Sequence, residues 1–277
     1  MTEIFQDKFK TFLIFSLLAF LGVFSAWLYG TISNQTRLRN IEVPRGFQFS
    51  YDYENNDRWT EYIKNPLPTV IHYGDKSSNK IALTFDDGPN NKTFNKLLDI
   101  LKEKNVKATF FMVGSQIKKY PHQVIRANKE GHQLGNHTLS HDRITGLSEH
   151  QIIEEVESVR TQIYRLTGKL VYLFRPPGGQ LDKLSLETIL KLKYTTVMWT
   201  ENAGDWDEKE KTTNVFKRVM QTKGGGIVLM HGISWQTVLV MPDIIDNLRE
   251  QGYEFVTIDH ILPDTNLQAN TGQYARN

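Results

Sequence analysis

Short apolar runs alternate with segments of helical periodicity from residue 80 to about residue 262. The runs KIALTF, ATFFMV and GIVLM are rich in aliphatic and aromatic side chains, which is typical of buried strands in a parallel sheet. We predict strands over residues 80–85, 107–113, 132–136, 170–174, 194–199, 226–230 and 253–258. We predict helices over residues 92–104, 115–130, 148–167, 182–192, 212–222 and 236–251.

This order of elements predicts β/α units. Ser148 and Gln151 fit a capping box at the start of the third helix. Repeated β/α units over about 180 residues favour an α/β fold with a parallel sheet, and we expect a distorted (β/α)7-8 barrel. An open, doubly wound sheet is the alternative.

The N-terminus has a different pattern. Segment 11–30 contains the uncharged run TFLIFSLLAFLGVFSAWLY. A helix needs about 20 apolar residues to cross hydrocarbon, so this segment predicts a transmembrane anchor behind a short N-terminal tail, residues 1–10. Trp27 and Tyr29 suit the far membrane interface. A cleaved signal peptide is the alternative.

The remaining segments differ in polarity. Residues 31–75 are polar and broken by prolines, which predicts a stem, and residues 263–277 predict a flexible C-terminal tail. Between them, residues 76–262 form the predicted folded domain. The net charge of +2 gives no reason to expect a nucleic-acid partner. The chain has no cysteine, which excludes disulfides, zinc–thiolate sites and a catalytic thiol.

Candidate catalytic residues follow the predicted strands, at the edge of the sheet where β/α enzymes carry their active sites. The first strand ends in Thr-Phe-Asp86-Asp87-Gly-Pro. Adjacent carboxylates repel each other, so such a pair needs a compensating cation or a catalytic role. The structural alternative is a turn in which an aspartate caps the next helix.

Two histidines, His137 and His141, follow the third strand in the sequence HTLSH. On one helical turn, side chains four positions apart face the same side and can bind one ion. A pair of capping or surface histidines is the alternative. With Asp87 they make two imidazoles and one carboxylate, and three protein ligands with an open position are typical of a catalytic metal site.

Three further strand ends carry polar residues. Arg175 precedes two prolines, Gly178 and Gly179, and the alternative there is an ordinary turn with a solvated arginine. Asp205-Trp206 follows the fifth strand, and Leu229-Met-His231 ends the sixth. A histidine that is oriented by an aspartate is a common acid–base pair, although a lone histidine after a strand is more often structural.

Together these residues resemble the polysaccharide deacetylases of carbohydrate esterase family four, the NodB-homology domain. The resemblance covers residues 70–262 and includes five motifs in order: TFDDGP at 84–89, HTLSH at 137–141, RPPG at 175–178, DW at 205–206 and LMH at 229–231. It implies that segment 76–262 is a catalytic domain of NodB type. It also implies removal of acetyl groups from an N-acetylated cell-surface polysaccharide, for which peptidoglycan is our first expectation.

The resemblance also implies roles for individual residues. Asp86 is expected to be the general base and His231 the general acid. Arg175 is expected to hold Asp86, and Asp205 to tune His231. Three residues are expected to bind the metal, namely Asp87, His137 and His141. Three others are expected to bind the substrate, namely Gly178, Trp206 and Leu229. The expected ion is zinc, with cobalt, nickel or manganese as alternatives.

One motif departs from the family. Many members follow Arg-Pro-Pro with an aromatic residue whose backbone N–H serves the oxyanion, whereas this chain has Gly178. We expect catalysis to survive and the substrate groove to change. We further expect a monomer on the outer face of the cell membrane, or a secreted protein if segment 11–30 is cleaved. An O-acetyl esterase acting on xylan-like glycans and a non-catalytic carbohydrate-binding module stay open as alternatives.

Overall fold

The computed structural model of the chain describes residues 70–262. The predicted tail 1–10, the predicted anchor 11–30, most of the predicted stem 31–75 and the predicted tail 263–277 lie outside these described residues. Between residues 70 and 262, no helix combines the length and the apolar character that a membrane span requires.

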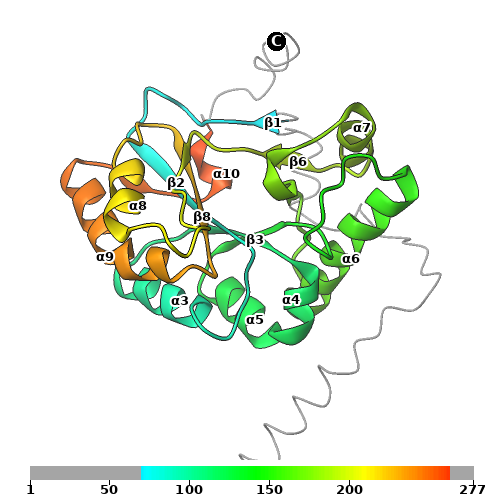
Figure 1. The fold of residues 1–277 in the computed structure, drawn as a ribbon, viewed down its shortest axis with the longest axis horizontal. Coiled ribbons are helices and arrows are strands. Elements are labelled where there is room, and N and C mark those ends of the chain that lie inside the picture. Colours follow the sequence, from blue (N-terminus) through cyan, green and yellow to red (C-terminus); the bar gives the residue numbers. More distant parts are fainter. Residues whose placement is uncertain (1–69, 263–277) are drawn as a thin grey trace, which may run out of the picture. The chain divides into compact units, whose positions relative to one another are not determined.

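A nine-stranded parallel sheet forms the centre of this part of the chain (Figure 1). In its middle lies β2 (Lys80–Asp86), which pairs with β3 (Thr109–Met112), β8 (Gly226–His231) and the short β9 (Glu254–Phe255). The other strands are β1 (Val70–Ile71), β4 (Gln133–Asn136), β5 (Leu173–Phe174), β6 (Thr195–Val197) and β7 (Glu201–Asn202). Their order across the sheet is β1, β6, β5, β4, β3, β2, β8 and β7.

The sheet curls but does not close into a full barrel. β1 and β7 are its two ends, and no pairing between them exists within residues 70–262. β1 pairs with β6 and β7 pairs with β8. Each end strand is two residues long, so neither offers a ladder that could join the two edges. The predicted α/β class is confirmed, and the predicted barrel is an open, curled half-barrel.

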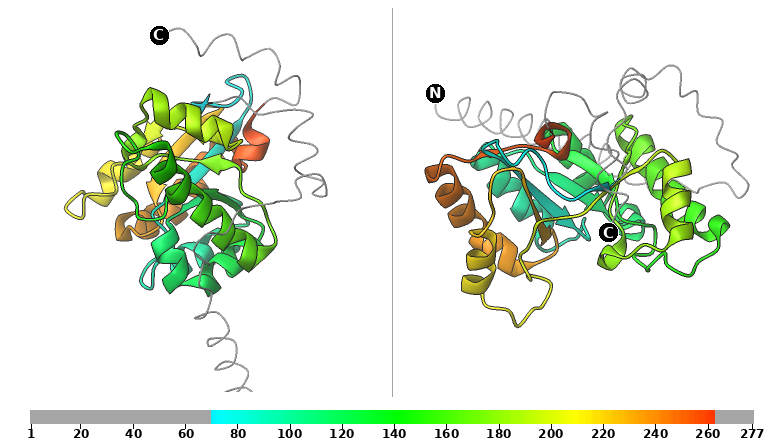
Figure 2. Two further views of the ribbon diagram at one scale, coloured as in Figure 1. Left: turned by 90° about the vertical axis from the view of Figure 1, so that its right-hand side faces the viewer. Right: turned by 90° about the horizontal axis from the view of Figure 1, so that it is seen from above.

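Helices line the outer side of the sheet (Figure 1, Figure 2). Neighbouring helices pack on one another in the order α8, α9, α3, α5, α6 and α7. Their bounds are α3 Phe94–Glu103, α5 Pro121–Lys129, α6 Glu149–Thr167, α7 Lys183–Lys191, α8 Thr212–Val219 and α9 Trp235–Glu250. Shorter elements are α4 (Gly114–Lys119), η2 (Pro177–Gly179) and α10 (Ile258–Ile261).

The main core lies between these helices and the sheet. α3 buries Phe94, Leu97, Leu98 and Leu101, which recur at helical spacing and so form one apolar face. Phe94 contacts Phe110 of β3 with ring centroids 5.1 Å apart. Each such side chain contributes about 1.5–3 kcal/mol on burial, so packing rather than any single polar contact holds the helices to the sheet.

Local sequence signals account for most of the element boundaries. Ser148 and Gln151 form the predicted capping box of α6. The predicted helix 115–130 is wrong in one respect, because α4 ends before Tyr120 and α5 begins at Pro121. Proline lacks an N–H and pushes the residue before it out of the helical region, and Tyr120 has φ −130° and ψ 52°.

Two strands have no counterpart in the predictions. β1 lies inside the segment assigned to the stem, so the fold begins before residue 76. β7 follows β6 and consists only of Glu201–Asn202. The predicted strand 253–258 is also shorter than expected, because β9 ends at Phe255 and α10 begins at Ile258.

Candidate metal centre and active site

The five motifs meet at the carboxyl ends of the strands. Asp86, the last residue of β2, lies opposite His231, the last residue of β8, in the parallel register. Asn136 of β4 lies opposite Phe174 of β5, so the residues that follow, His137 and Arg175, emerge side by side. The parallel sheet therefore brings together residues that lie far apart in the chain.

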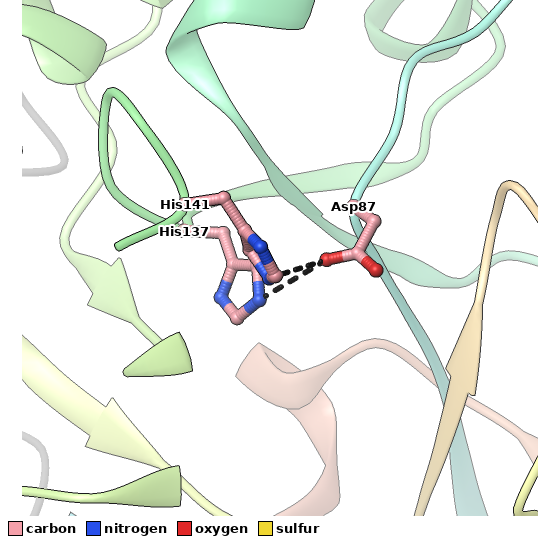
Figure 3. Close-up of side chains that lie close together, drawn as sticks. All are labelled: Asp87, His137 and His141. Carbon is pink, nitrogen blue, oxygen red and sulfur yellow. Dashed lines mark ion pairs between the residues drawn. The ribbon is translucent and has the colours of Figure 1, made fainter. Parts of the chain in front are cut away.

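Asp87, His137 and His141 point their ligand atoms at one another (Figure 3). Asp87 Oδ1 lies 3.4 Å from His137 Nε2 and 2.9 Å from His141 Nε2. One ligand atom from each residue lies within 4.8 Å of the other two. This is the spacing of groups that can share one ion, and two imidazoles with one carboxylate suit zinc and its first-row neighbours.

Hydrogen bonding within the cluster also fits a cation. His137 Nδ1 lies 2.7 Å from the Arg175 carbonyl, which can only accept, so Nδ1 carries the proton. In the neutral ring, Nε2 then carries a lone pair that points at the cluster, as in metal-ligating histidines. Asp87 Oδ1 is buried and faces the Nε2 atoms of both histidines. Acceptors that converge in this way repel unless a cation or a proton lies between them.

Protons and a metal ion would compete for these atoms. Burial by itself raises the pKa of Asp87, but contacts with His137 and His141 outweigh it and hold that pKa well below the usual range of a carboxyl. The contact with Asp87 in turn raises the pKa of His141. The charge of Asp87 thus favours the protonated form of His141, and a divalent ion would compete with that proton.

The backbone around the ligands is strained. Asp87, Thr138 and His141 have φ values of 70°, 65° and 72°, in the left-handed region that residues with a Cβ rarely adopt. Such conformations persist where surrounding contacts enforce them. Here Asn136 Oδ1 accepts a hydrogen bond from the Thr138 N–H, and Glu155 Oε2 accepts from the N–H of Ser140.

Asp86 and Arg175 form a buried ion pair beside the cluster. Arg175 Nη1 lies 2.8 Å from Asp86 Oδ1, and the exposed fractions of the two side chains are 0% and 5%. Arg175 also donates to Thr84 Oγ1 and to the carbonyls of Val197 and Met198. Burial lowers the pKa of Arg175 and the charge of Asp86 opposes that change. The other carboxylate oxygen, Asp86 Oδ2, lies 3.7 Å from His137 Nε2 and so faces the cluster.

His231 and Asp205 form a second pair. His231 Nδ1 lies 2.8 Å from Asp205 Oδ1, and Asp205 Oδ2 accepts from the His231 backbone N–H and from Thr237. Burial alone would lower the pKa of His231, but the bond to Asp205 and the nearby carboxylates raise it to about 9. His231 Nε2 lies 4.0 Å from Asp87 Oδ2. A protonated imidazole therefore faces the carboxylate of Asp87.

Comparisons with known proteins bear on the family of this chain. A family model described as polysaccharide deacetylase matches residues 73–197. The peptidoglycan-N-acetylmuramic acid deacetylase PdaA of Bacillus subtilis (strain 168) is 35% identical over 197 residues, which span 70% of this chain and 75% of PdaA. The chain belongs to the polysaccharide deacetylase family.

Other members differ in length and in the activity that their names state. The peptidoglycan-N-acetylmuramic acid deacetylase PdaC of Bacillus subtilis (strain 168) is 36% identical over 202 residues, which span 73% of this chain but 42% of PdaC. The solved Bc1960 peptidoglycan N-acetylglucosamine deacetylase has a TM-score of 0.68 at 30% identity, with 74% of this chain and 95% of that chain covered. BA3943 of Bacillus anthracis, named a CE4 family pseudoenzyme, has a TM-score of 0.67 at 28% identity, with 71% and 69% covered.

The three predicted substrate residues lie within three positions of a site residue along the chain. Leu229 is 5% exposed on β8, two residues before His231, whereas Trp206 is 68% exposed next to Asp205. Gly178 lies within η2 and has φ 68°. The roles of these residues, and those of the proton-transfer residues, stay predictions.

Sequence reasoning missed the residues that hold the predicted ones. Thr84 accepts from Arg175 and donates to the Val228 carbonyl, and its position two residues before Asp86 on β2 gave a signal, because both lie on one face. Thr237 and Glu155 gave none. Each lies on a helix and reaches a loop from a distant part of the sequence.

Proposed function

We propose that this protein is a metal-dependent hydrolase that removes N-acetyl groups from the sugars of peptidoglycan. The observation that carries the proposal is the convergence of Asp87, His137 and His141 between two ready proton-transfer pairs, Asp86–Arg175 and His231–Asp205. Peptidoglycan is supported by the names of several relatives, among them PdaA and PdaC.

Asp87, His137 and His141 fit a divalent ion, with zinc first and cobalt, nickel or manganese as alternatives. Such an ion supplies Lewis acidity, which polarises a carbonyl and acidifies water. The protein residues have separate tasks. Asp86 Oδ2 faces the cluster and takes the proton of the attacking water, while Arg175 holds the other oxygen in place.

The leaving group needs a proton because an amide nitrogen leaves poorly as an anion. His231 is held protonated by Asp205 and faces the cluster, so it can donate that proton to the nitrogen. The Gly178 N–H is our candidate for hydrogen bonding to the oxygen that becomes negative, a contact typically worth about 3 kcal/mol. Acetate and a free amine are the products. Leu229 and Trp206 are our candidates for the walls around the acetyl methyl.

A non-catalytic role has one specific observation behind it, because BA3943 carries the fold and is named a pseudoenzyme. We favour catalysis because the metal-ligand candidates and both proton-transfer residues are present here and lie within reach of one another.

The location of the protein is a separate proposal. We propose that segment 11–30 attaches the chain to the cell membrane with residues 76–262 outside, or that its cleavage releases the domain. The apolar run of the sequence and an extracellular polymer as substrate support this location. Fractionation of cells and the mass of the mature protein decide between an anchor and a signal peptide.

The decisive experiment measures acetate release from peptidoglycan, chitin oligomers and acetylated xylan. We expect release from peptidoglycan that stops with a chelator and returns with zinc. Asp86→Asn is the matched variant, because it keeps the shape of the side chain but cannot take the proton, and we expect it to bind metal and release no acetate. Release from xylan alone would favour the esterase, and release from none of them would overturn the proposal.

A further inference from the structure

The positively charged side chain of Arg143 lies next to Gly178. A Cβ added to Gly178 would point at Arg143, with Nε 3.6 Å and Nη2 4.0 Å away. The φ of 68° disfavours a bulky side chain at position 178, so no side chain there separates the backbone from the Arg143 guanidinium.

Arg143 is available to a ligand. Its side chain is exposed, and within residues 70–262 its guanidinium takes part in no hydrogen bond or ion pair. Two carboxylates from helix α6 and the start of α7 reach the same loop, and both accept from N–H groups instead. Asp182 accepts from Gly146 and Ser185, and Glu155 accepts from Leu139 and Ser140. An arginine without an internal partner presents a fork of donors that matches a carboxylate.

The position of this cation relates it to the reacting group. Arg143 follows the metal-ligand candidate His141 by two residues and borders Gly178, our candidate for the oxyanion donor. If the substrate acetamide binds at that donor, sugar carbon C3, next to the carbon that bears the acetamide, would lie near the Arg143 guanidinium. In N-acetylglucosamine that carbon carries a hydroxyl, and in N-acetylmuramic acid it carries a lactyl ether that ends in a carboxyl group.

We propose that Arg143 makes the enzyme select the carboxylate-bearing sugar, the N-acetylmuramic acid type, over the neutral N-acetylglucosamine type. The inference rests on the proposed deacetylase function and deepens it. Family membership does not decide the sugar, because relatives are named for either one. A lactyl group with a free carboxylate is preferred to a lactyl group that is joined to a peptide through an amide. The free carboxylate is charged, and a hydrogen bond to a charged acceptor is roughly twice as strong as one to a neutral acceptor.

The test compares two soluble tetrasaccharides with the full 277-residue chain in detergent micelles, loaded with zinc. One alternates N-acetylglucosamine with N-acetylmuramic acid and the other contains only N-acetylglucosamine. We expect wild type to have the higher kcat/KM on the first, with mass spectra that assign the free amine to the muramic residue. Arg143→Gln should lower the ratio of the two kcat/KM values about tenfold, and Arg143→Lys should lower it less.

Lys129→Gln is the matched control, since it removes one exposed positive charge from the end of α5, next to the amino end of β4. It should leave the ratio unchanged. A second measurement does not depend on turnover. In an Asp86→Asn background, calorimetry should show that Arg143→Gln weakens binding of the muramic tetrasaccharide and that added salt reduces the difference.

The outcomes separate the two proposals. If wild type releases acetate from both tetrasaccharides with a ratio that Arg143→Gln does not change, or if it prefers the neutral one, the deacetylase stands and the selectivity proposal is overturned. If loaded wild type releases acetate from neither tetrasaccharide nor from peptidoglycan, the deacetylase itself fails and the selectivity falls with it.

Discussion

Strand β4 has a buried histidine at each end, and the two are chemically opposite. His132 precedes the strand and is 5% exposed, and His137 follows it and is 2% exposed. His132 Nδ1 accepts from the Ala108 N–H, so its proton lies on Nε2. His137 donates from Nδ1 to the Arg175 carbonyl, so its lone pair lies on Nε2.

Their surroundings differ as much as their tautomers. Burial, with Lys107 and Arg126 nearby, lowers the pKa of His132 to about 4, and no hydrogen bond reaches its Nε2 within the described residues. His137 Nε2 faces the carboxylates of Asp86 and Asp87. Burial alone therefore does not identify a functional histidine. The hydrogen bond that fixes the tautomer and the acceptors that converge on the other nitrogen do.

The test with the largest expected effect replaces the histidine at each end of β4 in turn. His137→Ala should abolish metal binding and lower kcat about ten-thousandfold or more, because the ion supplies both carbonyl polarisation and water activation. His132→Gln should keep one metal ion per chain and near-normal kcat. Elemental analysis of the purified proteins together with acetate release checks both. Full metal content in His137→Ala would show that the ligand set is wrong.

His231 extends the comparison to a half-buried histidine that contacts a carboxylate but is not expected to bind metal. His231→Ala should retain the metal and lower kcat about a thousandfold, the usual contribution of a general acid. His122→Ala, at an exposed histidine of α5, is the control and should leave kcat unchanged. Loss of metal from His231→Ala would make His231 a ligand instead.

A smaller effect is expected from Asp205→Asn. A general acid works while protonated, so activity is lost as pH rises through its pKa, which Asp205 helps to raise to about 9. Without that charge the pKa returns toward 6.5, and at pH 8 only about 3% of His231 would be protonated. The rate should fall about thirtyfold at pH 8 and little at pH 6. An unshifted basic limb in the pH–rate profile would exclude Asp205 as the tuning group.

The same contrast separates what the sequence could predict from what it could not. The long strand β2 and the amphipathic helix α3 have local patterns, and both were predicted within two residues of their observed bounds. β1 and β7 have no pattern of their own, since two residues become a strand only through β6 and β8. Whether the sheet closes likewise depends on pairing between β1 and β7, which are far apart in the sequence.

The candidate site shows the same division. Asp86, Asp87, His137, His141 and His231 were predicted because they stand in short motifs at strand ends, and they do meet in space. Thr237 and Glu155 were not, because their contacts join α9 and α6 to loops that are far away in the sequence. Arg143 was missed for a similar reason, since its proximity to Gly178 appears only in three dimensions.

The smallest expected effect concerns stability and the amino end of β4. The pKa of His132 is lower in the folded protein than the unfolded value of 6.5, so the unfolded state binds the proton first. Its neutral ring leaves stability intact above pH 6.5, and stability is lost as pH falls toward 4. Between pH 7 and pH 5 this linkage costs about 2 kcal/mol.

His132→Gln keeps an acceptor for the Ala108 N–H but cannot be protonated, so its free energy of unfolding should fall by about 2 kcal/mol less than that of wild type over this range. Urea denaturation at the two pH values measures the difference. Equal losses in both proteins would mean that His132 is protonated in the fold, and the contrast between the two ends of β4 would then rest on tautomers alone.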